Sequence, residues 1–269
     1  MSVAPTRTIV SRDGTPIADF VGGAGAPVLL VHGTSADHTT FRVIVPRLAE
    51  AFTTHAIDRR GRGASGDTAP YAIEREFEDV AAAAQALAAE AGRPIPVVGH
   101  SYGGRCALGA ALLTDAIGRV ICYEGAPAPR GRSYRPAGLE VRLRDRLAAG
   151  DPEGALATFM TEVVGMTANE LDAYRANPVW PVRVGAAPTI LRELDAEASP
   201  PASLDPLGAV RQPVLQILGS ESRPIFRDAT VALDARLRDG RVVEIEGAKH
   251  AAHHSHPDAF VDAVRVFLA

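Results

Sequence analysis

The stretch Ile95-Pro96-Val97-Val98-Gly99-His100-Ser101-Tyr102-Gly103-Gly104 decides how the rest of this chain is interpreted. Its apolar start, residues 95–98, predicts a short buried strand, and the small residues that follow it predict a helix. Between them lies G-x-S-x-G, which in a strand–turn–helix setting forms a tight turn that exposes its serine. A side chain at Gly99 or Gly103 would collide with the neighbouring strand or helix. We therefore predict that Ser101 is a nucleophile at the carboxyl end of a sheet; the alternative is an ordinary glycine-rich turn.

Apolar runs and helical periodicities alternate along most of the chain. Helical spacing is clearest over residues 77–91, whereas residues 125–211 contain only short amphipathic helical patterns separated by prolines. The predicted strands are 8–10, 17–21, 28–31, 54–57, 95–98, 119–124, 214–218 and 242–245. This alternation predicts an α/β fold whose sheet is mostly parallel and covered by helices on both faces.

Composition limits the classes of partner. The chain has 269 residues, 46% of them hydrophobic, which is enough for a substantial core. Its net charge of −4 does not suggest a nucleic-acid surface or a basic membrane face. The start, Met1 to Arg7, has no basic segment leading into an apolar run, and no stretch reaches the ~18 apolar residues of a spanning helix. We expect a cytoplasmic protein that acts on a small molecule, with no nucleic-acid or membrane partner.

Four blocks of sequence resemble the α/β-hydrolase fold superfamily, and the resemblance covers nearly the whole chain. In order, the blocks are Val31-His32-Gly33-Thr34, residues 58–65, the Ser101 turn, and Gly247-Ala248-Lys249-His250 with Pro257-Asp258-Ala259-Phe260. The resemblance implies an eight-stranded, mostly parallel sheet flanked by helices, with a helical cap inserted after the sixth strand. We expect residues 1–134 and 206–269 to form the core and residues 135–205 to form the cap.

A serine hydroxyl needs a base to take its proton, and the resemblance assigns this role to His250. In most of the superfamily an aspartate in a G-x-x-D loop after the seventh strand orients that histidine. Here the loop is Gly219-Ser220-Glu221-Ser222, with serine in the place of the acid. Some members, including some haloalkane dehalogenases, carry the acid after the sixth strand instead, where this chain has Glu124. We expect Glu124 to orient His250, with Glu221, one residue early in its loop, as the alternative acid.

Two backbone N–H groups are candidates to hold the negative oxygen that forms when a serine attacks a carbonyl. The resemblance assigns one to Tyr102, directly after the nucleophile, and the other to Thr34, in the loop after His32-Gly33. The cap is expected to roof the pocket with apolar side chains, while Arg130, Arg132 and Arg135 are expected near its entrance. The expected lining residues are Met160, Val163, Val164, Met166 and Trp180.

A cluster of histidines close to His250 raises the question of a metal. His253, His254 and His256 follow it, but no matching array of cysteines or carboxylates accompanies them, and a serine hydrolase needs no metal. We therefore expect no metal and no cofactor. The three histidines are expected to be partly exposed residues of a loop that faces the cap.

These features predict a serine hydrolase that works through an acyl-enzyme, and the resemblance implies that its substrate is a carboxylic ester of small or medium size. Dehalogenases and epoxide hydrolases of this fold use aspartate as nucleophile, so Ser101 argues against their alkyl-enzyme chemistry. The same triad also fits a lactone, an amide, a thioester, a C–C bond beside a ketone, or acyl transfer to an alcohol. A further alternative is a ligand-binding protein with little turnover, such as the hormone receptors that share the fold.

Overall fold

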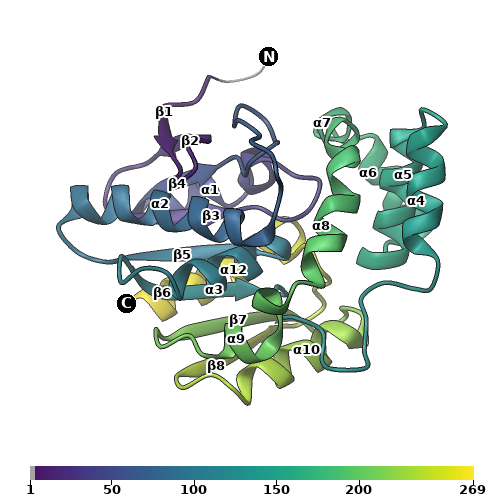
Figure 1. Cartoon of the computed structure of the whole chain (residues 1–269). Coiled ribbons are helices and arrows are strands. Elements are labelled where there is room, and N and C mark those ends of the chain that lie inside the picture. Colours follow the sequence, from purple (N-terminus) through teal and green to yellow (C-terminus); the bar gives the residue numbers. More distant parts are fainter. Residues whose placement is uncertain (1–3) are drawn as a thin grey trace.

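The structure, a computed structural model, describes residues 4–269 and has an eight-stranded sheet at its centre (Figure 1). Residues 1–3, which the expectation about a signal peptide partly concerns, lie outside the described residues. Within residues 4–269, no helix combines the length and apolar character needed to cross a membrane. The strands are β1 (Arg7–Val10), β2 (Pro16–Gly22), β3 (Ala26–Val31), β4 (Phe52–Ile57), β5 (Ile95–His100), β6 (Ile117–Tyr123), β7 (Val214–Gly219) and β8 (Gly240–Ile245).

The strand order across the sheet is β1-β2-β4-β3-β5-β6-β7-β8. Strand β2 pairs antiparallel with both β1 and β4, and every other neighbouring pair is parallel. Each predicted strand is present, with its ends shifted by at most a few residues. Because parallel strands end at the same edge of a sheet, the residues that follow β3, β5, β6, β7 and β8 come together there.

Helices cover both faces of the sheet, as the alternation in the sequence predicts. Successive residues of β3 point to opposite faces, so that Leu29 and Val31 pack in one core cluster and Val28 and Leu30 in the other. The first face is covered by α2 (Ile73–Ala91), α3 (Tyr102–Ala111), α9 (Leu204–Gly208) and α10 (Pro224–Asp234). The second is covered by η1 (His38–Phe41), α1 (Val45–Leu48), α11 (Ala252–Ser255) and α12 (Pro257–Leu268). Of these, α11 was not predicted.

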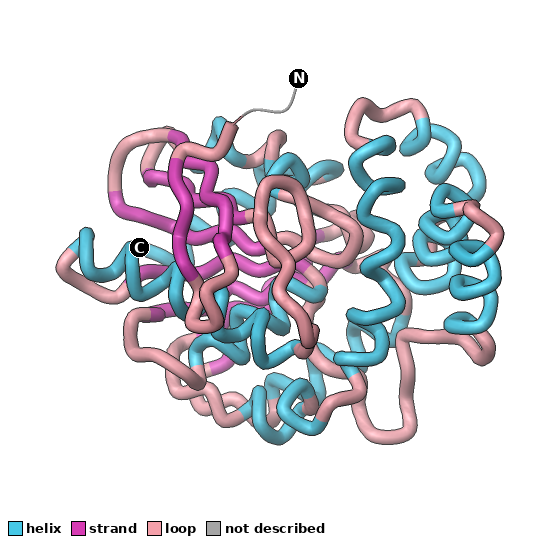
Figure 2. The backbone as a smooth tube through the Cα atoms, turned by 45° about the horizontal axis from the view of Figure 1, so that its top comes forward, coloured by secondary structure: helices cyan, strands magenta, loops and turns pink. Residues whose placement is uncertain are grey.

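Between β6 and β7 the chain forms a helical insertion, as the resemblance implies. Figure 2 shows these helices gathered beside the sheet rather than along its faces. They are α4 (Leu139–Ala148), α5 (Pro152–Phe159), η2 (Met160–Val164), α6 (Ala168–Arg175), α7 (Trp180–Ala186), η3 (Ala187–Thr189), α8 (Ile190–Glu197) and η4 (Pro200–Ala202). The division of the chain into a core of residues 1–134 and 206–269 and a cap of residues 135–205 stays a prediction.

Candidate active site

Ser101 stands alone between the last residue of β5 and the first residue of α3. Its backbone has φ 55° and ψ −123°, and its N–H donates to the carbonyl of Tyr123 at 2.8 Å. A Cβ at Gly99 would lie 2.3 Å from the carbonyl oxygen of Gly103, and one at Gly103 would lie 2.2 Å from that of Val31. Only glycine fits at these two positions, as the sequence predicts, because a side chain at either one would collide with the backbone.

Backbone strain is concentrated around this turn. Within residues 4–269, three residues other than glycine have a positive φ: Ser35 at 52°, Ser101 at 55° and Glu124 at 45°. Ser101 directly follows β5, Glu124 directly follows β6, and Ser35 lies in the loop after β3, so all three are at the same edge of the sheet. A positive φ is unfavourable for residues with a Cβ and persists where the surrounding structure imposes it, which is common at functional sites.

His250, in the loop after β8, lies against Glu124, the residue that follows β6. Its Nδ1–H donates to Glu124 Oε2 at 2.5 Å, and both side chains are buried. The other carboxylate oxygen, Oε1, accepts the N–H of Gly219 at 2.8 Å and the hydroxyl of Ser222 at 2.5 Å. These contacts fix the carboxylate, which in turn sets the tautomer of His250 and leaves Nε2 available to act as a base.

The loop after β7 has a serine where the resemblance implies an acid. Ser222, which occupies that place, donates to Glu124 from across the sheet edge. Glu221 is exposed, its N–H donates to the carbonyl of Ala248 at 2.9 Å, and its side chain has no hydrogen bond to His250 in the described chain. Sequence reasoning missed the contact of Ser222, although a serine at the position of the acid was the available signal.

Ser101 and His250 line one pocket of about 190 Å³ under the insertion. The two side chains share it without a hydrogen bond between Ser101 Oγ and His250 Nε2 within the described residues, a bond that commonly tightens only when substrate is bound. The insertion contributes mostly apolar side chains to the pocket, with Asn177 and Arg183 as exceptions, and the core contributes mostly polar ones. Its remaining lining residues are Thr34, Arg42, His100, Phe159, Met160, Val164, Met166, Tyr174, Asn177, Arg183, Ala251, His253 and His254.

The expected lining is only partly correct. Met160, Val164 and Met166 line this pocket, but Trp180 instead packs edge-on against Tyr174, with ring centroids 5.4 Å apart. Val163 lines a smaller cavity beside it. None of the three arginines expected near the entrance lines the pocket; these are Arg130, Arg132 and Arg135. Position in the chain near the cap does not determine which way a side chain points.

Ser101 also lines the smaller cavity, which has a volume of about 30 Å³. Thr34, Tyr102 and His250 contribute to its walls. The two cavities that Ser101 lines therefore differ in volume, about 30 Å³ against about 190 Å³.

The candidate oxyanion donors lie at this smaller cavity. The N–H of Tyr102 is in the first turn of α3, where N–H groups have no acceptor within the helix. Neither it nor the N–H of Thr34 donates to a protein group within residues 4–269. His32 supports the Thr34 loop, because its Nδ1–H donates to the carbonyl of Gly33 at 2.9 Å and its Nε2 accepts the N–H of Arg59 at 3.0 Å.

The histidines after His250 have different environments. His253 was expected to be partly exposed, but it is buried against His100, with ring centroids 4.4 Å apart, and its Nδ1 has no partner. His254 is half-buried in the pocket wall. Burial, followed by the charges of Arg42 and Arg183, lowers the pKa of His254 to about 4. It is therefore neutral near pH 7.

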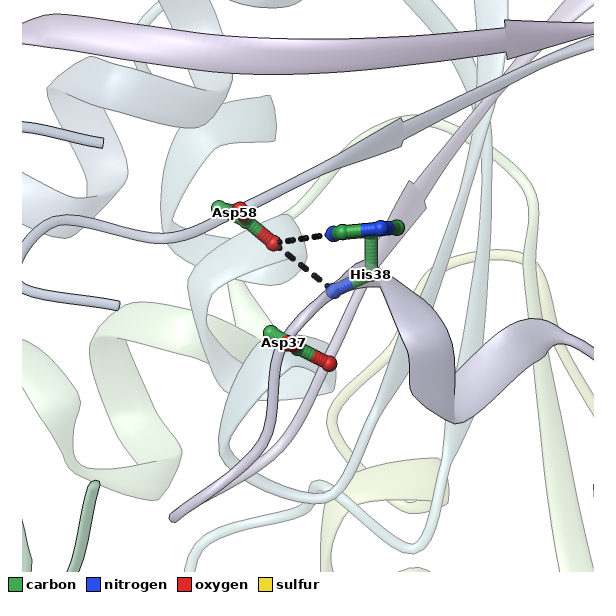
Figure 3. A group of neighbouring side chains, drawn as sticks. All are labelled: Asp37, His38 and Asp58. Carbon is green, nitrogen blue, oxygen red and sulfur yellow. Dashed lines mark hydrogen bonds and ion pairs between the residues drawn. The ribbon is translucent and has the colours of Figure 1, made fainter. Parts of the chain in front are cut away.

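One cluster in the described residues has the spacing of a metal site, namely Asp37, His38 and Asp58 (Figure 3). The N–H and the Nδ1–H of His38 both donate to Asp58 Oδ1 at 2.8 Å, and Asp58 Oδ2 accepts the N–H of Ala64 at 2.9 Å. Asp37 accepts the N–H of Thr39 at 3.0 Å. Hydrogen bonds within the chain therefore account for these carboxylates, which hold two loops together.

Comparisons with known proteins agree on the class of protein. The sequence profile of a family described as the alpha/beta hydrolase family matches residues 28–263. The chain is 27% identical over 252 residues to the 2-(acetamidomethylene)succinate hydrolase of Mesorhizobium japonicum, covering 91% of this chain and 89% of that protein. It is 28% identical over 263 residues to the pimeloyl-(acyl-carrier protein) methyl ester esterase of Stenotrophomonas maltophilia, covering 93% and 95%. A solved alpha/beta hydrolase from Sphaerobacter thermophilus superposes with a TM-score of 0.84 at 32% identity, covering 98% of this chain and 100% of that one.

Proposed function

The chain belongs to the alpha/beta hydrolase family, and we propose that it is a serine hydrolase that cleaves a carboxylic ester of a small or medium-sized substrate through an acyl-enzyme. The observation that carries the proposal is the hydrogen bond from His250 Nδ1 to Glu124, in a pocket that Ser101 also lines. A fixed imidazole with a free Nε2 beside a serine on a strained turn is the arrangement that nucleophilic catalysis requires.

In the proposed reaction, Ser101 Oγ attacks the carbonyl carbon while His250 Nε2 takes its proton. Glu124 stabilises the imidazolium that forms. The N–H groups of Tyr102 and Thr34 hold the negative oxygen of the tetrahedral intermediate. His250 then gives the proton to the departing alcohol. In the second half of the reaction it takes a proton from the water that attacks the acyl group, and it returns this proton to Ser101 Oγ as the acid is released.

Two variants distinguish the candidate acids. We expect Glu124→Gln to lower kcat by roughly 10⁴-fold, because an amide no longer stabilises the imidazolium. Glu221→Gln should retain a kcat close to that of the wild type, since its side chain is exposed and makes no hydrogen bond to His250 within the described chain. Steady-state kinetics on one ester decides between them, and a crippled Glu221→Gln would show that the wrong acid has been chosen.

The choice of an ester has two supports. One relative is named a methyl ester esterase, and the cavity of about 30 Å³ beside Ser101 suits a short group such as a methoxy leaving group. The larger pocket of about 190 Å³ then takes the acyl chain. The catalytic steps proposed above require no metal or cofactor.

The test is labelling of the intact protein with a fluorophosphonate, read by mass spectrometry, together with the turnover of methyl esters. A single adduct that is lost in Ser101→Ala, with turnover that is lost in the same variant, is the expected result. An adduct without turnover of any ester would favour a ligand-binding role, and the absence of an adduct would contradict the assignment of Ser101. Circular dichroism of Ser101→Ala controls for folding.

A further inference from the structure

The larger pocket contains positive charge without negative charge. Arg42 and Arg183 line it, and no aspartate or glutamate is among the residues that do so. Its histidines cannot supply the missing negative charge, because an imidazole is either neutral or positively charged. A charge that loses hydration is usually paired with an opposite charge, because a desolvated charge without a partner is costly. Arg42 is exposed, but Arg183 is half-buried, so its lack of a carboxylate partner needs an explanation.

Arg183, on α7, is half-buried and has only neutral partners. It donates to Thr40 Oγ1 at 2.8 Å and, more weakly, to the carbonyl of Ser35 at 3.4 Å. No carboxylate of residues 4–269 forms an ion pair with it, although a guanidinium has five N–H groups to donate. Most of its hydrogen-bonding capacity remains open toward the pocket that it lines.

Arg42, just after η1, lies more exposed at the same pocket. Its guanidinium donates to the carbonyl of Thr39 and to Asn177 Oδ1, both at 3.3 Å. The charge of Asp37 acts on Arg42 at a distance, without an ion pair between the two in the described chain. Burial and the charge of Arg183 lower the pKa of the Arg42 guanidinium, which remains charged at neutral pH.

Besides burial, the positive charges of Arg42 and Arg183 contribute to a lowered pKa at His254. This histidine lines the same pocket, and the like charges of Arg42 and Arg183 add to burial in lowering its pKa to about 4. The pocket thus disfavours a further proton and favours an anion. His253, whose Nδ1 is buried without a partner, provides another polar group in the same wall.

We propose that Arg42 and Arg183 form a carboxylate-binding subsite, so that the substrate is a short ester bearing a free carboxylate on its acyl part. The inference rests on the proposed function and names its substrate class. A carboxylate matches the fork of a guanidinium with two parallel hydrogen bonds, and it would supply the negative charge that the pocket lacks. The apolar residues Phe159, Met160 and Val164 enclose the methylene chain between the carboxylate and the ester.

The test compares methyl monoesters with methyl diesters of the same straight-chain dicarboxylic acids, from succinate to suberate, by pH-stat. The pair has the same skeleton, and only the monoester carries a charge. We expect the wild type to prefer a monoester in kcat/KM by about 10- to 100-fold, the usual effect of a charge-assisted pair. Arg183→Gln should remove most of this preference by lowering kcat/KM for the monoester much more than for the diester. A wild type without a preference for the monoester would overturn the subsite.

Arg144→Gln is the matched control. Arg144 is an exposed arginine of α4 that does not line the pocket, and its substitution removes the same charge from the insertion. It should leave the ratio of monoester to diester unchanged. An equal loss in Arg144→Gln and Arg183→Gln would mean that the net charge of the protein, rather than a subsite, selects the monoester.

A binding measurement keeps the inference testable whatever the turnover. In Ser101→Ala, calorimetry with the monoester should give a Kd that rises at least about tenfold when Arg183→Gln is added, while the Kd of the diester changes much less. The subsite would be overturned if the monoester did not bind to Ser101→Ala, or if Arg183→Gln left the Kd of the monoester unchanged. Failure of the subsite with intact labelling of Ser101 leaves the proposed serine hydrolase standing, whereas loss of labelling contradicts the proposed function itself.

Discussion

Two pairs of arginines in this molecule have opposite surroundings. Arg59 and Arg62, in the loop after β4, are fully buried and lie against carboxylates, forming with Glu76 and Glu193 what we call the buried network. Arg42 and Arg183, the pocket pair, contact only neutral oxygens within residues 4–269. The residue type is the same, and the difference is whether the chain itself supplies the counter-charge.

The buried network joins the core to the insertion. Arg59 forms two parallel bonds to Glu76 of α2, at 2.8 and 2.7 Å, while both Arg59 and Arg62 donate to Glu193 of α8. Burial raises the pKa of Glu76, but the charges of Arg59 and Arg62, together with hydrogen bonds from Arg59 and Tyr71, bring the pKa below its ordinary value. Helix α8 is thereby fixed over the sheet edge, which holds the roof of the pocket in place.

The comparison teaches how to interpret an arginine beside a pocket. A buried charge with partners stabilises the arrangement of the elements that provide those partners. Its removal leaves the remaining charges buried without a counter-charge. A charge that has no partner at a pocket wall contributes little to the fold, but it offers a ligand a strong contact. Loss of the first should therefore be measured as stability and loss of the second as specificity.

The largest effect is expected from Glu193→Gln, which removes the shared carboxylate of the buried network. The change keeps the shape of the side chain but leaves Arg62 without its principal ion pair and Arg59 with only Glu76. Breaking a buried pair from one side costs about 3–5 kcal/mol of the free energy of unfolding. Urea unfolding followed by circular dichroism measures this loss.

The control is Glu50→Gln, which removes a carboxylate from an exposed ion pair with Arg265. Exposed pairs contribute under about 1 kcal/mol, so this variant should unfold near the wild-type midpoint. Arg183→Gln should also unfold near that midpoint. A loss in Arg183→Gln as large as that in Glu193→Gln would erase the distinction between the two arginine pairs.

Much of the fold could be predicted because its signals are local. Apolar runs such as residues 28–31 and 214–218 form strands that are buried on both faces. Gly99 is needed because a side chain there would collide with the backbone of Gly103, only four residues away. The helical insertion was expected from the loss of strand patterns after residue 125. Local signals failed for α11, a single turn too short to show a periodicity.

The site was predictable only where one residue implies another. Serine at the usual position of the acid directed attention to Glu124, which indeed lies within a hydrogen bond of His250. The buried network was not predictable, because Arg59 and Glu193 are far apart in the sequence and only the folded chain brings them together. Arg42 and Arg183 were missed for the same reason.

A smaller effect concerns the dependence of stability on pH through His254, which senses the pocket pair. Its pKa is about 4 in the folded chain against an ordinary value of about 6.5, so between these values the unfolded chain binds more protons. His254 therefore destabilises the fold as the pH falls through this window. From pH 7 to pH 5, His254→Asn should lose about 2 kcal/mol less stability than the wild type. Urea midpoints at both pH values measure it, and equal losses would contradict the neutral, repelled state of His254.

The smallest effect is the response to salt, which should separate the two arginine pairs in one protein. Arg42 is exposed, so added salt screens its attraction for a carboxylate, whereas the buried network is screened much less. Between low salt and about 0.5 M NaCl, kcat/KM for the best methyl monoester should fall a few-fold, while that of its diester and the urea midpoint change little. Arg42→Gln should flatten the response of the monoester, with Arg144→Gln as its control. If the monoester and the diester lose activity in parallel, salt acts on the protein as a whole, and the pocket pair has no special attraction for an anion.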